Sequence, residues 1–199
     1  EVSSKLHATE ASSIIKIIAQ DISSYEEGAH TGEVAASMLK GIASGVMIGH
    51  SERRFGAGED LGLISKKIER AVNAELEVIL CVGSKSKDLN THKVEVYDQL
   101  CSALVKFNSQ NSGLLTVAYE PVFAIGTGDI PTDQFLIDQL ESIRLILQDS
   151  KFSSRVLYGG SVNTSNSKSI LGLGFDGLLV GSASLKVPNL EDIGINIQA

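Results

Sequence analysis

Short apolar runs that recur along the chain constrain its fold more than any other feature of the sequence. Six runs are rich in Ile, Val and Leu, and each ends in small or polar residues: 14–19, 45–49, 78–82, 115–119, 155–158 and 177–180. Continuous rather than alternating hydrophobicity is typical of strands buried on both faces, as in a parallel sheet covered by helices. Most runs begin roughly thirty to forty residues after the previous one, the length of one strand–helix–strand unit.

The residues between these runs follow a helical period. Apolar side chains recur there at every third or fourth position, which is typical of amphipathic helices laid over a sheet. We expect each apolar stripe to pack into the core. The stripes are Val34, Met38 and Ile42; Leu61, Ile64, Ile68 and Val72; Val96, Leu100 and Leu104; and Leu136, Leu140, Ile143 and Leu147.

Alternation of strands and helices predicts one α/β domain over residues 1–199, with right-handed connections. No low-complexity segment or run of charges divides the sequence. An open doubly wound sheet and a closed barrel both fit this pattern. The motifs at the strand ends must distinguish them.

The charge balance disfavours two classes of partner. The 199 residues include 17 basic and 24 acidic side chains, which gives a formal charge of −7. Nucleic acids and anionic membrane surfaces are bound by clustered Lys and Arg, so neither is expected as a partner. No apolar run approaches the roughly 20 residues that span a bilayer. Cys81 and Cys101 fit neither a zinc site nor a disulfide framework, and we expect a reduced, cytoplasmic location and no metal.

A polar cluster with the sequence GHSERR, residues 49–54, follows the second apolar run. His50 leaves a buried strand beside Ser51 and Glu52, which can fix the tautomer of its ring. A histidine in an arbitrary loop more often satisfies local hydrogen bonds, but the density of polar neighbours here favours contact with a ligand. The other histidines lack such neighbours and are expected to be surface or packing residues: His7, His30 and His92.

The fourth apolar run leads to Glu120, and a loop with apolar and glycine residues follows: Pro121, Val122, Phe123, Ala124, Ile125, Gly126, Thr127 and Gly128. A carboxylate at the end of a buried strand is suited to act as a general base once a closing loop removes water from it. The alternative is a surface acid paired with an arginine, beside ordinary loop packing. Exposed apolar side chains gathered in one loop favour a lid over a ligand.

Glycine turns follow the fifth and sixth apolar runs. Residues 158–162 read YGGSV, and residues 181–184 read GSAS. Glycine lets a ligand approach backbone N–H groups, and a helix N-terminus adds partial positive charge. Either turn alone is common in α/β proteins, but the pair after the last two strands fits the phosphate site of a β/α barrel.

Taken together, six segments resemble the triosephosphate isomerase family. They occur in the family's order over nearly the whole chain: 19–21, 28–33, 49–54, 118–128, 158–162 and 176–185. Six motifs in order at suitable spacing form a highly specific match. The resemblance implies an α/β fold, the (β/α)8 TIM barrel, of which this chain would supply about six strands, the third to the eighth, and their helices.

The resemblance also implies a reaction. The family interconverts dihydroxyacetone phosphate and D-glyceraldehyde 3-phosphate through an enediolate, in glycolysis and gluconeogenesis, without a metal or an organic cofactor. Glu120 matches the catalytic base and His50 matches the electrophile, with Ser51 and Glu52 as supporting residues of the same loop. The family is itself a standard example of this acid–base chemistry.

The family's phosphate site and lid have counterparts in this sequence. The positions whose backbone amides hold the phosphate match Gly126, Ser161, Gly181 and Ser182. Residues 121–128 match the mobile lid, which excludes water and limits the loss of phosphate from the enediolate.

A loop at 28–33 matches the family's contact with a neighbouring subunit. It carries Thr31, which implies a homodimer with Thr31 near the partner's active site. Three positions depart from the family pattern. Phe123 stands where a tryptophan is usual in the lid, Ser84 replaces a common glutamate, and Ser182 replaces a frequent glycine, but neither the base nor the electrophile is changed.

The largest departure lies at the N-terminus. The family's first two strands, the helix between them and an Asn-Trp-Lys segment with its substrate-binding lysine have no counterpart, so residues 1–6 are expected to end the family's second helix. We expect an isomerase whose sequence here lacks its N-terminal quarter. Because six strands cannot close an eight-stranded barrel, the alternative is an inactive fragment of that enzyme. A sugar-phosphate epimerase fits less well, because the motifs at 50–53 and 119–121 argue against it.

Overall fold

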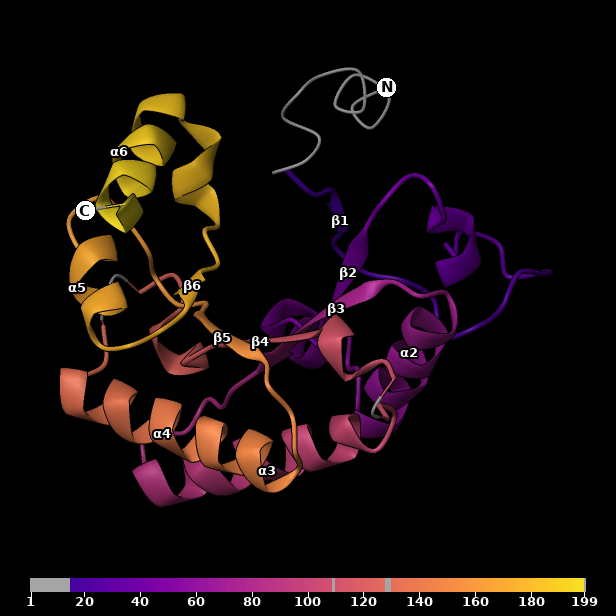
Figure 1. Ribbon diagram of the computed structural model, residues 1–199, viewed down its shortest axis with the longest axis horizontal. Coiled ribbons are helices and arrows are strands. Elements are labelled where there is room, and N and C mark those ends of the chain that lie inside the picture. The colour runs from indigo at the N-terminus through magenta and orange to yellow at the C-terminus, as the bar shows by residue number, and fades with distance from the viewer. Residues whose placement is uncertain (1–14, 109, 128–129, 199) are drawn as a thin grey trace. The chain divides into compact units, whose positions relative to one another are not determined.

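The computed structural model describes residues 15–108, 110–127 and 130–198, and it contains a sheet of six strands (Figure 1). Neighbouring strands follow chain order, and the β1–β2, β2–β3, β4–β5 and β5–β6 pairs are parallel. This arrangement confirms the expected partial (β/α)8 barrel. The strands are β1 (Ile18–Ala19), β2 (Gly45–Ile48), β3 (Glu77–Val82), β4 (Leu115–Tyr119), β5 (Arg155–Tyr158) and β6 (Gly177–Leu178).

Helices connect most of these strands, and three of them, α2 to α4, lie where the helical periods predict them. The α-helices are α2 (Leu61–Asn73), α3 (Leu89–Leu104), α4 (Asp133–Asp149), α5 (Ser167–Gly172) and α6 (Val187–Gln198). The short helical turns are η2 (Ala36–Leu39), η3 (Glu52–Gly56), η4 (Ser112–Leu114), η5 (Val122–Ala124) and η6 (Ser182–Leu185). In the part of the chain that the structure describes, no helix combines the length and the apolar character needed to cross a membrane.

The described residues form two compact units. The first unit comprises residues 15–80, 102–108 and 110–115, and it holds β1, β2, most of β3 and α2. The second unit comprises residues 81–101, 116–127 and 130–198, and it holds the end of β3, most of α3 and β4, the strands β5 and β6, and the helices from α4 to α6. The expectation of one domain over residues 1–199 stays a prediction.

The core of the first unit lies between its strands and α2. Val46 pairs with Val78, and Ile48 pairs with Leu80. All four side chains are buried, as is Ile68 on α2. The helix begins at Asp60, whose carboxylate accepts the backbone N–H of Leu63 at 2.7 Å and satisfies one of the donors left over at a helix start.

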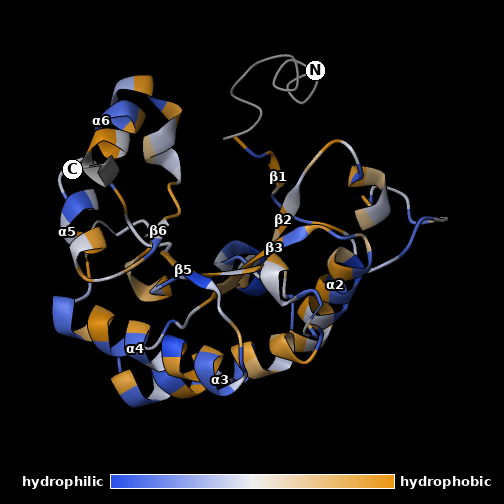
Figure 2. Cartoon of the chain, in the orientation of Figure 1, coloured by the Kyte–Doolittle hydropathy of each residue, from blue (hydrophilic) through white to orange (hydrophobic). Residues whose placement is uncertain are grey.

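The core of the second unit lies under α4. Thr132 begins this helix by accepting the N–H of Phe135 at 3.3 Å. The apolar stripe Leu136, Leu140, Ile143 and Leu147 is buried as expected, and Figure 2 shows apolar and polar residues alternating along the helix. Burying side chains of this size stabilises the fold by roughly 1.5–3 kcal/mol each.

Among the predicted stripes, Leu61 at the start of α2 is 37% exposed rather than buried, and one stripe is wrong throughout. Val34, Met38 and Ile42 are about half exposed, at 45%, 51% and 54%. The segment forms only the four-residue turn η2, and Gly41, with φ +76°, lies just beyond it. Without two full helical turns, side chains four positions apart no longer share a buried face.

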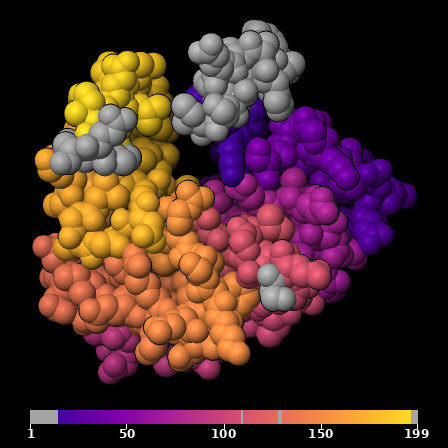
Figure 3. All heavy atoms as spheres, in the orientation of Figure 1, coloured from indigo at the N-terminus to yellow at the C-terminus, as the bar shows by residue number. Residues whose placement is uncertain are grey.

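Two strands are at least two residues shorter than the apolar runs that predict them. The run at 14–19 forms a strand only at Ile18–Ala19, and residue 14 lies outside the described residues. The run at 177–180 forms a strand only at Gly177–Leu178. Beyond β6, α6 packs against α5 and η6, and these segments form a continuous orange-to-yellow mass in Figure 3.

Candidate active site

His50 follows the carboxyl end of β2 in the first unit. Gly49, with φ +78°, turns the chain out of the strand in a conformation that side chains with a Cβ rarely adopt. The carbonyl of His50 accepts the N–H groups of Arg53 at 2.8 Å and Arg54 at 3.1 Å. His50 is half-buried, Ser51 is buried and Glu52 is exposed at the start of η3. The strand end and the turn thus hold His50 on rigid backbone.

The hydrogen bonds of this turn fix the tautomer of His50. The backbone N–H of Glu52 donates to Nδ1 of His50 at 3.3 Å. A ring nitrogen that accepts a hydrogen bond carries no proton, so the proton of the neutral imidazole lies on Nε2. His50 therefore presents an N–H donor at Nε2.

A buried charge network supports the His50 turn. Nζ of Lys67, on α2, lies 2.7 Å from both carboxylate oxygens of Asp21 and 2.6 Å from Oε1 of Glu59. Arg53 joins the same two acids, at 3.0 Å to Asp21 and 2.6 Å to Glu59. The hydrogen bond that Arg53 donates to Glu59 raises the pKa of Arg53. Arg53 thereby links the turn that carries His50 to the segment after β1 and to α2.

Sequence reasoning missed Lys67 and Glu59. Both are buried, with 3% and 5% of their surface exposed. The one available signal was a lysine three positions after Ile64 and directly before Ile68, on a helix stripe that is otherwise apolar. A charged residue on a buried face is rare unless a partner accompanies it.

Glu120 follows β4 directly in the second unit. Its N–H donates to the carbonyl of Val82 at the end of β3, at 2.7 Å, so the strand-like pairing continues one residue beyond β4. The residue is fully buried. Side chains alternate between the faces of a strand, so Glu120 points to the face opposite that of Tyr119.

Two glycines allow other strand ends to approach Glu120. A Cβ on Gly83 would lie 1.7 Å from the carbonyl oxygen of Glu120, and a Cβ on Gly159 would lie 3.2 Å from its Cγ. The N–H of Gly159 also donates to the carbonyl of Tyr119 at 2.8 Å. Glu120 is thus enclosed by the ends of β3 and β5, where Gly83 leaves room that a Cβ would take and a Cβ on Gly159 would be a tight contact.

The predicted lid residues differ in burial. Ala124 and Pro121 are buried, Val122, Phe123 and Ile125 are half-buried, and Gly126 and Thr127 are exposed. The expectation that the four apolar side chains from Val122 to Ile125 are all exposed is therefore wrong, because they pack into the unit. Gly128 lies outside the described residues.

Hydrogen bonds attach this loop to neighbouring segments at its start and at Ala124. The N–H of Val122 donates to the carbonyl of Ser84 at 3.1 Å. The hydroxyl of Ser161 donates to the carbonyl of Ala124 at 2.9 Å, and that of Thr127 donates to the same carbonyl at 3.1 Å. One predicted phosphate residue, Ser161, is thus in direct contact with the predicted lid.

The two glycine turns leave paired strands. Tyr158 pairs with Leu178, and the N–H of Leu179 donates to the carbonyl of Tyr158 at 2.8 Å, so the turns after β5 and β6 start at the same edge. Ser161 is half-buried, while Gly181 and Ser182 are exposed, and Gly181 immediately precedes η6. Backbone N–H groups at such positions are available to an anion.

Tyr158 lies at the start of the turn after β5. Its hydroxyl is buried and has no hydrogen-bond partner among the described residues, and burial raises its pKa to about 12. A Cβ on Gly160 would lie 2.2 Å from this hydroxyl, so glycine is required at that position.

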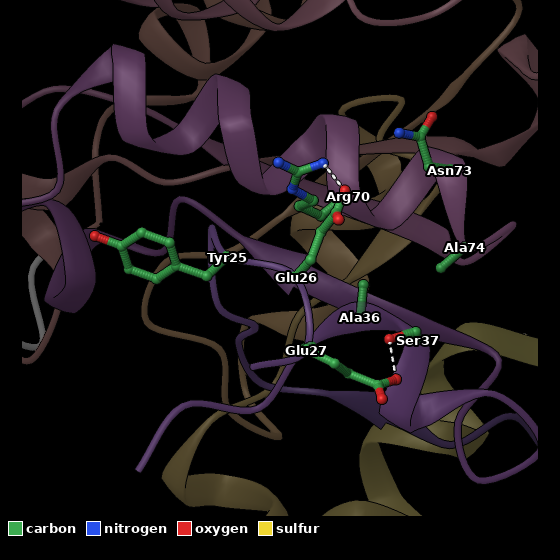
Figure 4. Close-up of a pocket in the computed structure, with 9 residues that line it drawn as sticks. Tyr25, Glu26, Glu27, Ala36, Ser37, Arg70, Asn73 and Ala74 are labelled. Atoms are coloured by element: carbon green, nitrogen blue, oxygen red, sulfur yellow. Dashed lines mark hydrogen bonds and ion pairs between the residues drawn. The ribbon is translucent and has the colours of Figure 1, made fainter. Parts of the chain in front are cut away.

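Thr31 lies in an exposed loop of the first unit, and the segments before and after this loop line a hollow. The hollow measures about 330 Å³, and Figure 4 shows two of its hydrogen-bonded pairs, Glu26 with Arg70 and Glu27 with Ser37. No predicted catalytic or phosphate residue lines it. Within the adjacent loop, the rings of Tyr25 and His30 stack at 4.1 Å.

Comparison with known proteins agrees with this geometry. The family model described as triosephosphate isomerase matches residues 2–197. The triosephosphate isomerase of Lawsonia intracellularis is 40% identical over 189 residues, which cover 91% of this chain and 75% of that protein. That of Chloroherpeton thalassium is 36% identical over 190 residues, with 91% and 75% covered. That of Thermodesulfovibrio yellowstonii is 40% identical over 182 residues, with 86% and 72% covered.

The match is continuous and extends over nearly the whole chain, while the chain spans about three quarters of the length of these relatives. The matched range includes the six strands of the sheet and the segments around His50 and Glu120. The chain belongs to the triosephosphate isomerase family.

Proposed function

We propose that this isomerase uses Glu120 as its catalytic base and His50 as its electrophile. The burial of Glu120 carries the proposal. A fully buried carboxylate is shielded from water, as a general base in a closed site must be, and this one follows a strand end beside glycines. The tautomer of His50 supports the second role, because Nε2–H is a neutral donor suited to a carbonyl oxygen.

The reaction needs one base and one donor. Glu120 takes a proton from C1 of dihydroxyacetone phosphate, and the electrons of that C–H bond form the C1–C2 double bond while the carbonyl electrons move to O2. His50 donates to the enediolate oxygens and assists transfer of the hydroxyl proton from O1 to O2. Glu120 then returns its proton to C2, which gives D-glyceraldehyde 3-phosphate. No group enters or leaves, so the atoms balance without a co-reactant.

The phosphate is assigned to backbone N–H groups of Gly126, Ser161, Gly181 and Ser182. Such groups bind an anion without a nearby lysine, which suits a chain of net charge −7. The contact between Ser161 and Ala124 supports a coupling between phosphate binding and the lid at 121–128. A closed lid would exclude water from the enediolate.

A homodimer through the Thr31 loop is also proposed, together with a cytoplasmic role in glycolysis and gluconeogenesis. The support is a set of half-exposed apolar side chains that follow this loop: Val34, Met38 and Ile42. Exposed apolar side chains that form a contiguous patch are typical of a protein–protein interface. Thr31→Arg should convert a dimer to monomers in sedimentation equilibrium, and a protein that is monomeric before the change would contradict the proposal.

Substitution of Glu120 tests the catalytic assignment. Glu120→Asp withdraws the carboxylate by one methylene, so kcat should fall on the order of a hundredfold while KM changes little, because substrate contacts remain. Glu120→Gln should remove measurable turnover.

The matched control is Glu141→Asp, the same change at an exposed position of α4. It should leave both constants unaltered in a coupled assay of the purified protein. A Glu120→Asp variant with unchanged kcat would contradict the role of Glu120.

A further inference from the structure

His92 is fully buried in α3, although the sequence suggested only a surface or packing role. Its Nδ1 lies 2.9 Å from the carbonyl oxygen of Ser86, and its Nε2 lies 3.0 Å from the hydroxyl of Tyr119. A carbonyl can only accept, so Nδ1 carries the proton and Nε2 accepts the Tyr119 O–H. Burial lowers the pKa of His92, which agrees with a neutral ring.

The His92 ring also belongs to an aromatic cluster. Phe123 and Phe135 each meet it edge to face, with centroids 5.9 and 5.3 Å away, and they meet one another at 5.6 Å. A hollow of about 350 Å³ flanks Phe123 and Phe135, and Lys87 also lines it. The contacts with His92 and Phe135 therefore hold Phe123 in place beside open volume.

These contacts connect His92 to two parts of the proposed machinery. Tyr119 directly precedes Glu120, so a fixed Tyr119 hydroxyl fixes the strand end from which the base projects. Phe123 lies within η5, the first turn of the lid. The Phe123 ring has no polar atom, so it contacts His92 by packing alone, whereas the Tyr119 hydroxyl is hydrogen-bonded to Nε2 of His92.

We propose that His92 is a positioning residue for the isomerase reaction: its Nε2 holds Tyr119, its ring holds Phe123, and together they set the placement of Glu120 and of the lid. The inference rests on the proposed roles of Glu120 and of residues 121–128. His92 itself exchanges no proton with the substrate.

Three variants separate the hydrogen bond from the packing. His92→Phe keeps a ring but leaves the Tyr119 hydroxyl without its acceptor. Tyr119→Phe removes the hydroxyl, and the double variant removes both. We expect His92→Phe to lower kcat by about tenfold or more with little change in KM, because small displacements of a catalytic group are costly. It should also raise the share of substrate lost as inorganic phosphate.

The double variant should recover much of the lost kcat, because an unsatisfied buried hydroxyl costs more than the absence of both partners. A purely structural role of His92 would not produce this recovery or change the partition to phosphate. Asp98→Asn, at an exposed position of the same helix, is the matched control and should change neither quantity.

The outcomes distinguish this inference from the assignment of Glu120. If His92→Phe has unchanged kcat, KM and phosphate release while Glu120→Gln is inactive, the positioning role is overturned and the catalytic assignment stands. If Glu120→Gln remains active, the assignment itself is wrong.

If His92→Phe does not fold, nitrogen NMR of the unsubstituted protein tests the positioning role of His92. His92 should carry its proton on Nδ1 both with and without bound glycerol 3-phosphate, and a proton on Nε2 would overturn the proposal.

Discussion

The backbone N–H of Glu52 donates to Nδ1 of His50 at 3.3 Å, and this one contact sets the chemistry of the imidazole. It leaves the ring proton on Nε2. Nitrogen NMR should therefore show His50 protonated at Nε2 and His92 protonated at Nδ1, two opposite tautomers in one chain.

The same contact makes a mutational prediction for His50. Glu52→Ala should not alter the tautomer of His50, because the backbone rather than the carboxylate makes the bond. His50→Gln should lower kcat on the order of a hundredfold, the usual loss for a donor to a developing oxyanion. A proton found on Nδ1 of His50 would contradict the assigned tautomer, and an unchanged kcat in His50→Gln would contradict the role of His50.

Lys67 should be essential to the stability of the first unit. Lys67→Met would leave the buried Glu59 and the partly exposed Asp21 without one of their cations, and breaking a buried ion pair such as Lys67–Glu59 costs about 3 kcal/mol or more. Urea unfolding should show this loss as a lower midpoint.

Lys106→Met is the matched control for Lys67→Met. It breaks a solvent-exposed pair with Glu69, 2.7 Å apart, and should lower the urea midpoint much less than Lys67→Met does, because solvent screens exposed ion pairs. Equal losses in the two variants would show that the buried network does not stabilise the fold.

Gly83→Ala should disturb the strand end that carries Glu120. The added Cβ would lie 1.7 Å from the carbonyl oxygen of Glu120, so β3 and β4 must separate there. We expect a lower free energy of unfolding, by about 1–3 kcal/mol or more, together with a reduced kcat. Gly113→Ala, where a Cβ would meet no atom within 4 Å, should be close to neutral in the same urea titration.

The buried imidazole of His92 should make stability depend on pH. Burial lowers its pKa, against smaller opposite effects of the Ser86 carbonyl and Glu95. Below about pH 6.5, the ordinary pKa of histidine, the unfolded chain therefore binds a proton at His92 more readily than the folded chain does. The contribution of His92 is therefore complete above about pH 6.5 and declines as the pH falls toward the lower folded value.

Urea midpoints at about pH 7.5 and 5.5 measure this decline. The drop should be smaller in His92→Gln than in the unsubstituted protein. The other ionisable groups near His92 are Lys87 and Asp88 on the preceding loop and Tyr119 on β4, and both proteins contain them. The difference between the two drops therefore isolates His92, and equal drops would contradict its neutral, buried state.

Some features could be predicted because they depend on neighbours in the sequence. The strand at Leu115–Tyr119 agrees with its apolar run, and the buried stripes of α3 and α4 agree with their helical period. Burial on both faces of a strand, or on one face of a helix, leaves a repeating pattern that any window of residues contains. The stripe at Val34 failed because its helix is too short to bury a face.

The sequence by itself determined the order of strands and helices and the segments that hold His50 and Glu120, because these depend on local hydrophobic periods and contiguous motifs. Only the tertiary structure decided which polar groups meet. Lys67 contacts Asp21 across 46 residues, and Tyr119 contacts His92 across 27. No local pattern encodes such pairs, because burial makes each charge or hydroxyl dependent on a partner that distant strands and helices bring to it.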